Sequence, residues 1–377
     1  MSGIYIHIPF CKKACHYCNF HFSTNLKTMD ALLSAISNEI TLRKNYLHDT
    51  VHTIYWGGGT PSILPAAVIH TMLHQIRSQF TVAPDAEITL ESNPDDITTE
   101  NLQQWKQAGV NRLSIGIQSF FEEDLAWMNR AHNATQAKAA IELAQAAGFD
   151  NITIDFIYGG PTLSDEHWKQ NVQTAIALGI PHLSCYALTV EPKTALEKMI
   201  AQHKKEDVDT DKQSRHFDQL VQWVTAAGFE HYEISNFARP GYRSKHNSNY
   251  WAGTHYLGVG PSAHSFNGIS RQWNIANNTL YTQSLEKGEV PFEVEYLTTK
   301  QQLNEYIMTS LRTMEGLHLK KIQEIQPGLA GEKTVEQLKK GAAKYIQQGL
   351  MLQQEDTLII TNAGKFLADG IAADLFC

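Results

Sequence analysis

A helix-to-strand junction recurs four times in the middle of the 377-residue chain, and it limits the fold more than any other feature. In each copy a helix-like stretch ends in Gly, which is followed by an apolar residue and a short β-rich run. Gly fits the left-handed backbone position just past a helix end, and the apolar residue after it can pack back on the helix. The copies occupy residues 108–119, 147–159, 178–190 and 227–237.

Three further β-rich runs, "GIYIHIPF", "TIYWGGG" and "EITLESNP", come before these junctions, with amphipathic helices between them. Alternating helices and nearly continuous apolar strands predict a parallel sheet covered by helices. Six or seven such units favour a partial (β/α) barrel over a flat, doubly wound sheet. We therefore expect an α/β fold in which residues 1–240 form a partial (β/α) barrel.

Two segments of different character follow the barrel. Residues 241–294 are rich in Asn, Ser, Gly and Tyr and carry "HNSNYW" (His246–Trp251), and they predict a connecting segment of long ordered loops. Residues 295–377 show helical patterns, then strand, polar turn, strand and short helix. This order predicts a small winged-helix-like α+β domain. Because the segment is not strongly basic, we expect a structural or docking domain and not a DNA-binding one.

Composition restricts the partner and the compartment. A net charge of −8 argues against nucleic acid as the main partner. The chain has no apolar run of about 18 residues, which a membrane-spanning helix needs. Five cysteines, few and odd in number, favour a reducing cytosol over a disulfide framework. We expect a cytoplasmic protein, and peripheral contact with a membrane stays open. Cys185 fits a buried small hydrophobic residue, and Cys377 at the chain end has no assigned role.

The segment "CKKACHYC" places Cys11, Cys15 and Cys18 in one short loop after the first predicted strand. Three thiolates can each bind one iron of a [4Fe–4S] cluster, and the fourth iron is then left for an exchangeable ligand. The alternatives are three unrelated buried cysteines, or a zinc site that His7 or His16 completes.

Other polar or Gly-rich residues also follow predicted strands, at 57–60, 91–94, Gln118 and Asp155. The carboxyl ends of parallel strands meet at one edge of the sheet, where α/β folds bind their ligands. An Asp among the apolar neighbours of "ITIDFIYG" also needs a hydrogen-bond partner, because an unpaired buried polar group costs several kcal/mol. The sequence therefore predicts one site that gathers these residues and the cysteine loop.

Several motifs in this order resemble the radical S-adenosylmethionine (SAM) superfamily, and within it the oxygen-independent coproporphyrinogen oxidase-like group. They are "GIYIHIPFC", "CKKACHYC", "GGGTPS", "ESNPDD", "RLSIGIQSF", "NRAH" and "IDFIYGGP". The resemblance implies a three-cysteine [4Fe–4S] cluster whose open iron binds the amine and carboxylate of SAM. Carried over residue by residue, it implies a SAM site made of Tyr5, Tyr17, Gly58, Gly59, Thr60, Glu91, Gln118, Arg130, Asp155 and Ala187.

Two departures separate the chain from the decarboxylating oxidases of that group. The oxidases carry a fourth cysteine where this chain has Phe20, and they have an extension before the first strand, whereas only ten residues precede Cys11 here. Both features, and "HNSNYW", resemble the HemW-type proteins, a group described as haem chaperones. The resemblance implies haem contact by His246, Tyr250 and Trp251, and imidazole is a natural axial ligand of haem iron. His255 and His264 lie nearby and stay open as alternative ligands.

The sequence therefore favours a haem chaperone that keeps a [4Fe–4S] cluster and SAM and passes haem to an acceptor protein. That acceptor is unidentified, and a membrane-associated respiratory protein is one candidate. The alternative is a radical SAM enzyme that converts coproporphyrinogen III to protoporphyrinogen IX or acts on another tetrapyrrole. Whether the chain is an enzyme stays open, because the radical machinery looks intact while oxidase activity is not expected. A zinc-binding regulator is a third, weaker reading, and a homodimer stays open.

Overall fold

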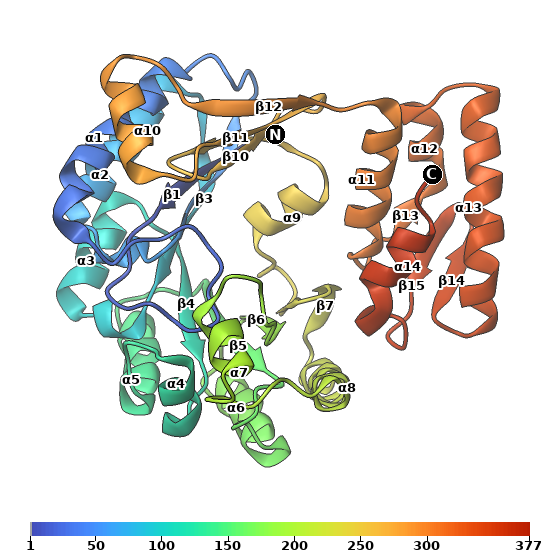
Figure 1. Cartoon of the computed structure of the whole chain (residues 1–377), viewed down its shortest axis with the longest axis horizontal. Helices are drawn as coiled ribbons and strands as arrows, with labels where there is room; N and C mark the ends of the chain where they lie inside the picture. The colour runs from blue at the N-terminus through green and yellow to red at the C-terminus, as the bar shows by residue number, and fades with distance from the viewer. Residues whose placement is uncertain (1) are drawn as a thin grey trace.

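The computed structural model describes residues 2–377, and its main feature is a 12-stranded sheet. The strand order is β12-β11-β10-β9-β1-β2-β3-β4-β5-β6-β8-β7. Its centre consists of parallel strands: β1 (Ser2–Ile8), β2 (Val51–Gly58), β3 (Val82–Ser92), β4 (Arg112–Gln118), β5 (Ile152–Tyr158) and β6 (His182–Ala187). Figure 1 shows that these strands follow one another around a curve. The predicted α/β fold with a partial (β/α) barrel is confirmed.

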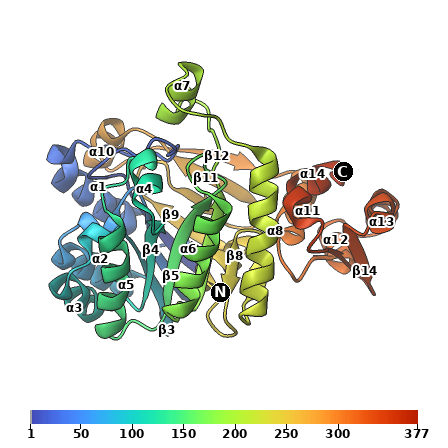
Figure 2. The same cartoon turned by 90° about the horizontal axis from the view of Figure 1, so that it is seen from below.

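Helices cover the outside of the sheet, as Figure 2 shows from below. They are α1 (Met29–Leu42), α2 (Ala66–Gln79), α3 (Thr99–Ala108), α4 (Glu122–Met128), α5 (Ala134–Ala146), α6 (Asp165–Ala177) and α8 (Thr210–Ala226). The short helix α7 (Ala195–Ala201) projects away from this layer. Among residues 2–377, no helix combines the length and apolar character that a membrane span requires.

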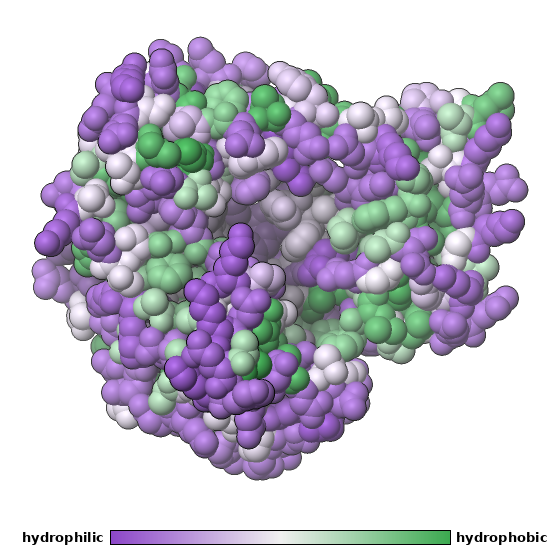
Figure 3. Space-filling view, in the orientation of Figure 1, coloured by the Kyte–Doolittle hydropathy of each residue, from purple (hydrophilic) through white to green (hydrophobic). Residues whose placement is uncertain are grey.

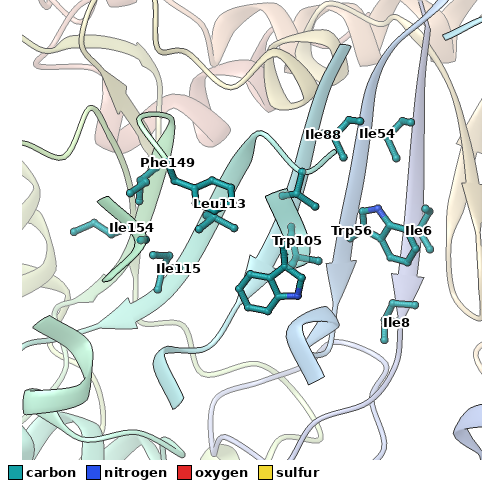
Figure 4. Packing of buried hydrophobic residues seen from close by; sticks show 14 of the residues in the cluster. Ile6, Ile8, Ile54, Trp56, Ile88, Trp105, Leu113, Ile115, Phe149 and Ile154 are labelled. Carbon is teal, nitrogen blue, oxygen red and sulfur yellow. The ribbon is translucent and has the colours of Figure 1, made fainter. Parts of the chain in front are cut away.

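The two faces of the central strands differ, which corrects the expectation of nearly continuous apolar strands. Side chains alternate between the faces of a strand. On β1 the outward residues Ile4, Ile6 and Ile8 are at most 1% exposed and belong to the core under the helices. Figure 4 shows Ile6 and Ile8 packed there beside Trp56 and other core residues. The alternate residues of the strands, such as Tyr5 and His7, line cavities on the inner face.

The predicted junctions occur as expected in three of four copies. The glycine of each copy adopts a left-handed backbone (Gly109, Gly148, Gly179 and Gly228, φ between 70° and 103°). The first three copies lead into parallel strands, but the fourth leads into β7 (Glu230–Glu233), which forms an antiparallel hairpin with β8 (Asn236–Ala238). The chain turns back after Glu233 without a crossover helix, which a parallel partner would require.

The expectation of loops over residues 241–294 is wrong. This segment contains α9 (Lys245–Trp251), β9 (His255–Val259), β10 (His264–Phe266), β11 (Ser270–Asn274), α10 (Asn278–Glu286) and β12 (Phe292–Tyr296). Strand β9 pairs in parallel with β1, and the next three strands extend the sheet edge. Leu257, Val259 and Tyr281 belong to the barrel core, so the segment is part of the barrel and not a connection. Strand β12 is the edge of the sheet, and β10 and β11 are short and mostly polar, so their sequences show no apolar run that would predict a strand.

Residues after β12 form a second hydrophobic core, and the boundary near residue 295 stays a prediction. It lies between helices and a three-stranded sheet of order β13-β15-β14. The helices are α11 (Thr299–Leu311), α12 (Leu319–Ile325), α13 (Leu329–Gln347) and α14 (Ala368–Asp374), and the strands are β13 (Leu317–His318), β14 (Met351–Gln354) and β15 (Thr357–Ile360). The predicted small α+β domain is therefore present. In Figure 1 it lies beside the open side of the barrel, with α9 between the two.

Candidate functional site

The cysteine loop is anchored at the carboxyl end of β1. The Cys11 N–H donates to the Ser23 carbonyl (3.0 Å), and the Ser23 N–H donates to the Pro9 carbonyl (2.8 Å). The Thr60 N–H donates to the Phe10 carbonyl (2.7 Å), so the glycine-rich loop after β2 packs against the base of the cysteine loop. This pairing brings two predicted motifs to one edge of the sheet, where residues of both line the same cavity. Figure 3 shows that this face of the molecule is hollowed between the barrel and the C-terminal domain.

Cys11, Cys15 and Cys18 all line one cavity of about 740 Å³. Burial raises the pKa of Cys11, and burial raises the pKa of Cys18 to about 11, with the nearby Cys15 and Cys11 adding to the increase. Thiolates in this pocket therefore need positive charge beside them. Arg130 supplies one cation, since its Nη1 lies 3.2 Å from the Cys15 Sγ.

This donor set fits a [4Fe–4S] cluster better than a zinc ion. A cluster takes one thiolate on each of three irons, so the sulfurs need not converge on one ion. The part of the chain described, residues 2–377, contains no three His, Cys, Asp or Glu side chains grouped to hold a single metal ion. His7 is also occupied, because its Nδ1 lies 3.1 Å from the Tyr5 hydroxyl and its Nε2 lies 3.0 Å from the His21 carbonyl.

The structure gathers nine of the ten predicted SAM residues in the cavity that the cysteines line. They are Tyr17, Gly58, Gly59, Thr60, Glu91, Gln118, Arg130, Asp155 and Ala187. Seven of them lie on or just after strands β2 to β6, whereas Tyr17 lies in the cysteine loop and Arg130 follows α4. Tyr5 is the exception, since it lines a second cavity.

Glu91 and Asp155 are acids held inside the first cavity. The Tyr55 hydroxyl donates to Glu91 Oε1 (2.7 Å) and the Gly58 N–H donates to Oε2 (3.2 Å), while burial raises the Glu91 pKa to about 7. The Ser114 hydroxyl lies 3.4 Å from both oxygens of Asp155, and burial raises the Asp155 pKa to about 6. A cationic or hydrogen-bond-donating ligand beside either acid would favour its carboxylate form.

Two further residues of the cavity are tightly constrained. Gln118 has a left-handed φ of 65°, a conformation that costs a non-glycine residue about 1 kcal/mol or more and that recurs at functional sites. The Arg130 guanidinium donates to the Asn93 side chain (2.8 Å) and the Gly116 carbonyl (2.9 Å). These bonds hold it between β3, β4 and the cysteine loop. Its Nε has no hydrogen-bond partner within the described part of the chain, which leaves a donor for a ligand.

A second cavity of about 540 Å³ lies beside the first and is rich in imidazole and phenol rings. Five histidines (His7, His21, His246, His255 and His264) and five tyrosines (Tyr5, Tyr55, Tyr186, Tyr250 and Tyr256) line it. The rings come from β1, β2, β6, α9, β9, β10 and the loop after Cys18. This combination offers nitrogen ligands and flat faces in one place.

His246 lies on the inner face of the sheet. Its Nδ1 is 2.9 Å from the Thr53 hydroxyl, and its ring stacks on Tyr55 with the centroids 4.9 Å apart. Burial lowers the His246 pKa to about 4, so the imidazole is neutral and able to bind a metal. Among residues 2–377, none is a hydrogen-bond partner of its Nε2. Of the other two predicted haem residues, Tyr250 lines this cavity, but Trp251 lines neither and lies under the Arg312 guanidinium (4.9 Å).

Six residues line both cavities, and we call them the shared wall: Asn19, Phe20, Tyr55, Glu91, Tyr186 and Asn247. Phe20, which stands where the oxidases have a cysteine, is 66% exposed. The sequence reasoning missed Tyr55, although it precedes the glycine-rich loop by two positions and shares its strand face with Thr53. Strand alternation was the signal that could have found it.

Two sequence profiles match the chain. Residues 5–175 match the radical SAM superfamily, and residues 297–367 match the HemN C-terminal domain. "Heme chaperone HemW" of Mycobacterium tuberculosis (strain H37Rv) is 34% identical, with 99% of this chain and 94% of the relative covered. The protein of the same name from Bacillus subtilis (strain 168) is 32% identical, with 98% of both chains covered. The chain belongs to the HemW family.

A solved structure of a related protein has a similar fold. The coproporphyrinogen III oxidase HemN of Escherichia coli, described as a radical SAM enzyme, matches with a TM-score of 0.85 at 26% identity. The match covers 100% of this chain and 90% of that one. The resemblance to the radical SAM superfamily and to HemW-type proteins is therefore confirmed. The roles of individual residues in this HemW-family chain stay predictions.

Proposed function

We propose that the protein is a haem chaperone that binds haem in the second cavity and passes it to an acceptor protein. The observation that carries the proposal is the cavity of five histidines and five tyrosines, set against the cysteine-lined cavity, in a chain whose relatives are named haem chaperones. His246 is the proposed ligand, because its neutral ring has a free Nε2 and a fixed Nδ1. A fixed second nitrogen orients a histidine toward its metal.

We further propose that Cys11, Cys15 and Cys18 hold a [4Fe–4S] cluster and that the first cavity takes SAM. When bound, the cluster would supply an iron open to the amine and carboxylate of SAM. The Glu91 carboxylate would pair with the amine, and Asp155 and Gln118 would accept and donate hydrogen bonds at the ribose. Arg130 would face the SAM carboxylate. The free Arg130 Nε and the raised pKa of both acids support this assignment.

The second candidate is a radical SAM oxidase that decarboxylates coproporphyrinogen III. The first cavity favours it, because nine of the ten residues carried over for SAM line that cavity. Phe20 opposes it, because it removes the fourth cysteine of the oxidases and lies in the shared wall.

One pair of assays separates the two candidates. The haem-loaded, cluster-reconstituted protein is mixed with a haem-free acceptor, such as apomyoglobin, and the acceptor spectrum is followed. The same preparation is incubated anaerobically with coproporphyrinogen III, SAM and a reductant. Haem transfer without protoporphyrinogen formation supports the chaperone. Formation of protoporphyrinogen would replace it with the oxidase.

For the cellular setting we propose a cytoplasmic protein that meets its acceptor at the membrane surface. The physiological acceptor would be a membrane-associated respiratory protein, and the protein would act as a homodimer. The five cysteines form no disulfide, which supports a reducing compartment. Cross-linking in cells, followed by fractionation, tests it.

A further inference from the structure

Tyr55 on β2 contacts the key residue of each cavity. Its hydroxyl donates to Glu91 Oε1 (2.7 Å), and its ring stacks on His246 with a centroid distance of 4.9 Å and an angle of 27° between the planes. Glu91 is the proposed partner of the SAM amine, and His246 is the proposed ligand of haem. One side chain of the shared wall therefore joins the two proposed sites.

The surroundings of Tyr55 leave little room for it to move independently. A Cβ added at Gly57 would lie 2.9 Å from Tyr55 Cε1 and 3.0 Å from Glu91 Oε1, so only glycine lets these groups pack together. On the other side, the His246 ring is fixed by the Thr53 hydroxyl (2.9 Å). A change in the orientation of the Tyr55 ring therefore changes the surface on which His246 rests.

We propose that Tyr55 is a positioning residue that couples the cavities, so that SAM bound in the first cavity tightens haem binding in the second. This inference rests on the proposed function. The amine of SAM would hold Glu91 as a carboxylate, and a hydroxyl donates a stronger hydrogen bond to a carboxylate than to a neutral acid. That bond fixes the Tyr55 ring and with it His246. A preoriented ligand loses less freedom on binding.

The sign of the coupling distinguishes this account from simple crowding. Because the two cavities share six wall residues, two ligands that crowded each other would weaken each other's binding. Positioning through Tyr55 predicts the reverse. Coupling is also reciprocal, so haem should tighten SAM binding by the same factor.

The test measures the haem dissociation constant of the cluster-reconstituted protein by optical titration, with and without saturating SAM. For the wild type we expect SAM to tighten haem binding by about fivefold or more. Tyr55→Phe keeps the stacked ring and loses only the hydroxyl. Without SAM, the haem dissociation constant of this variant should lie within about twofold of the wild-type value. Adding SAM should no longer lower that constant. Tyr242→Phe, the same change at an exposed position outside both cavities, should keep the full effect.

Two results would overturn the inference while leaving the proposed function intact. One is a wild-type haem affinity that SAM leaves unchanged or weakens. The other is a Tyr55→Phe variant that keeps the SAM effect. Failure of the proposed function looks different: the wild type then binds no haem even without SAM, or equilibrium dialysis detects no SAM binding, and both proposals fall together.

Discussion

Replacing Glu91 by Gln should stabilise the empty protein at alkaline pH. Burial raises the Glu91 pKa from 4.5 to about 7, so the carboxylate is disfavoured in the folded state. Between these values the folded protein binds more protons than the unfolded chain, and stability therefore falls as the pH rises. A difference of about 2.5 pKa units corresponds to a cost of about 3 kcal/mol above the folded pKa.

The glutamine variant removes this cost but loses part of the local bonding. Its amide oxygen can still accept from the Tyr55 hydroxyl, whereas its amino group faces the Gly58 N–H, which donates to Glu91 in the native site. The lost hydrogen bond costs about 1 kcal/mol. We therefore expect a net gain of about 2 kcal/mol near pH 8, and almost none near pH 5. For a chain of this length the gain at pH 8 corresponds to a Tm about 2–3 °C higher.

The assay is thermal unfolding of the cluster-free protein across this pH range, with Asp150→Asn as the control for a carboxylate at an exposed position. The control should leave the pH dependence unchanged. Equilibrium dialysis of the reconstituted Glu91→Gln protein should show weaker SAM binding, because the amine loses its charged partner. A Tm difference between Glu91→Gln and wild type that is the same at pH 5 and pH 8 would refute the reasoning.

Three further predictions follow from single contacts. Cys15→Ser should abolish the broad visible absorption of the reconstituted protein, and cluster absorption that persists in this variant would contradict the three-cysteine assignment. Thr53→Val removes the hydroxyl 2.9 Å from His246 Nδ1. We expect optical titration to show haem binding about tenfold weaker in this variant. An unchanged affinity would show that His246 is not held through Nδ1. Trp105→Ala removes a core side chain that is 1% exposed, and it should lower the free energy of unfolding, measured with denaturant, by about 3–5 kcal/mol. A loss below about 1 kcal/mol would contradict the packing in Figure 4.

Much of the first cavity could be predicted because it follows from local rules. Parallel strands bring their carboxyl ends to one edge, so residues on or just after different strands, such as Thr60 (β2), Gln118 (β4) and Asp155 (β5), line one cavity. The glycines of the helix-to-strand junctions mark where each strand begins. Tyr5 lines the second cavity together with His7, because strand alternation turns both side chains to the inner face, and motif matching alone does not show this.

Only part of the second cavity could be predicted: His246, Tyr250, His255 and His264 were named from the sequence, but long-range packing brings the other lining residues to them. Helix α9 folds over the inner face of β1 and β2, and this brings His246 against Thr53 and Tyr55 from distant parts of the chain. Neighbouring residues of the HNSNYW motif also face different surroundings. Adjacent positions on a helix point in different directions, so Tyr250 lines the cavity while Trp251 contacts Arg312 of the C-terminal domain.

The central claim is that haem binds in the second cavity through His246, and ligand replacement tests it most directly. Haem is titrated into wild type, His246→Ala and His74→Ala, the last an exposed histidine on α2, and each complex is examined by optical and electron paramagnetic resonance spectroscopy. Our account predicts histidine-ligated haem in the wild type and in His74→Ala. It also predicts a shifted Soret band and an affinity at least about tenfold weaker in His246→Ala. An identical spectrum and affinity in all three proteins would contradict the account.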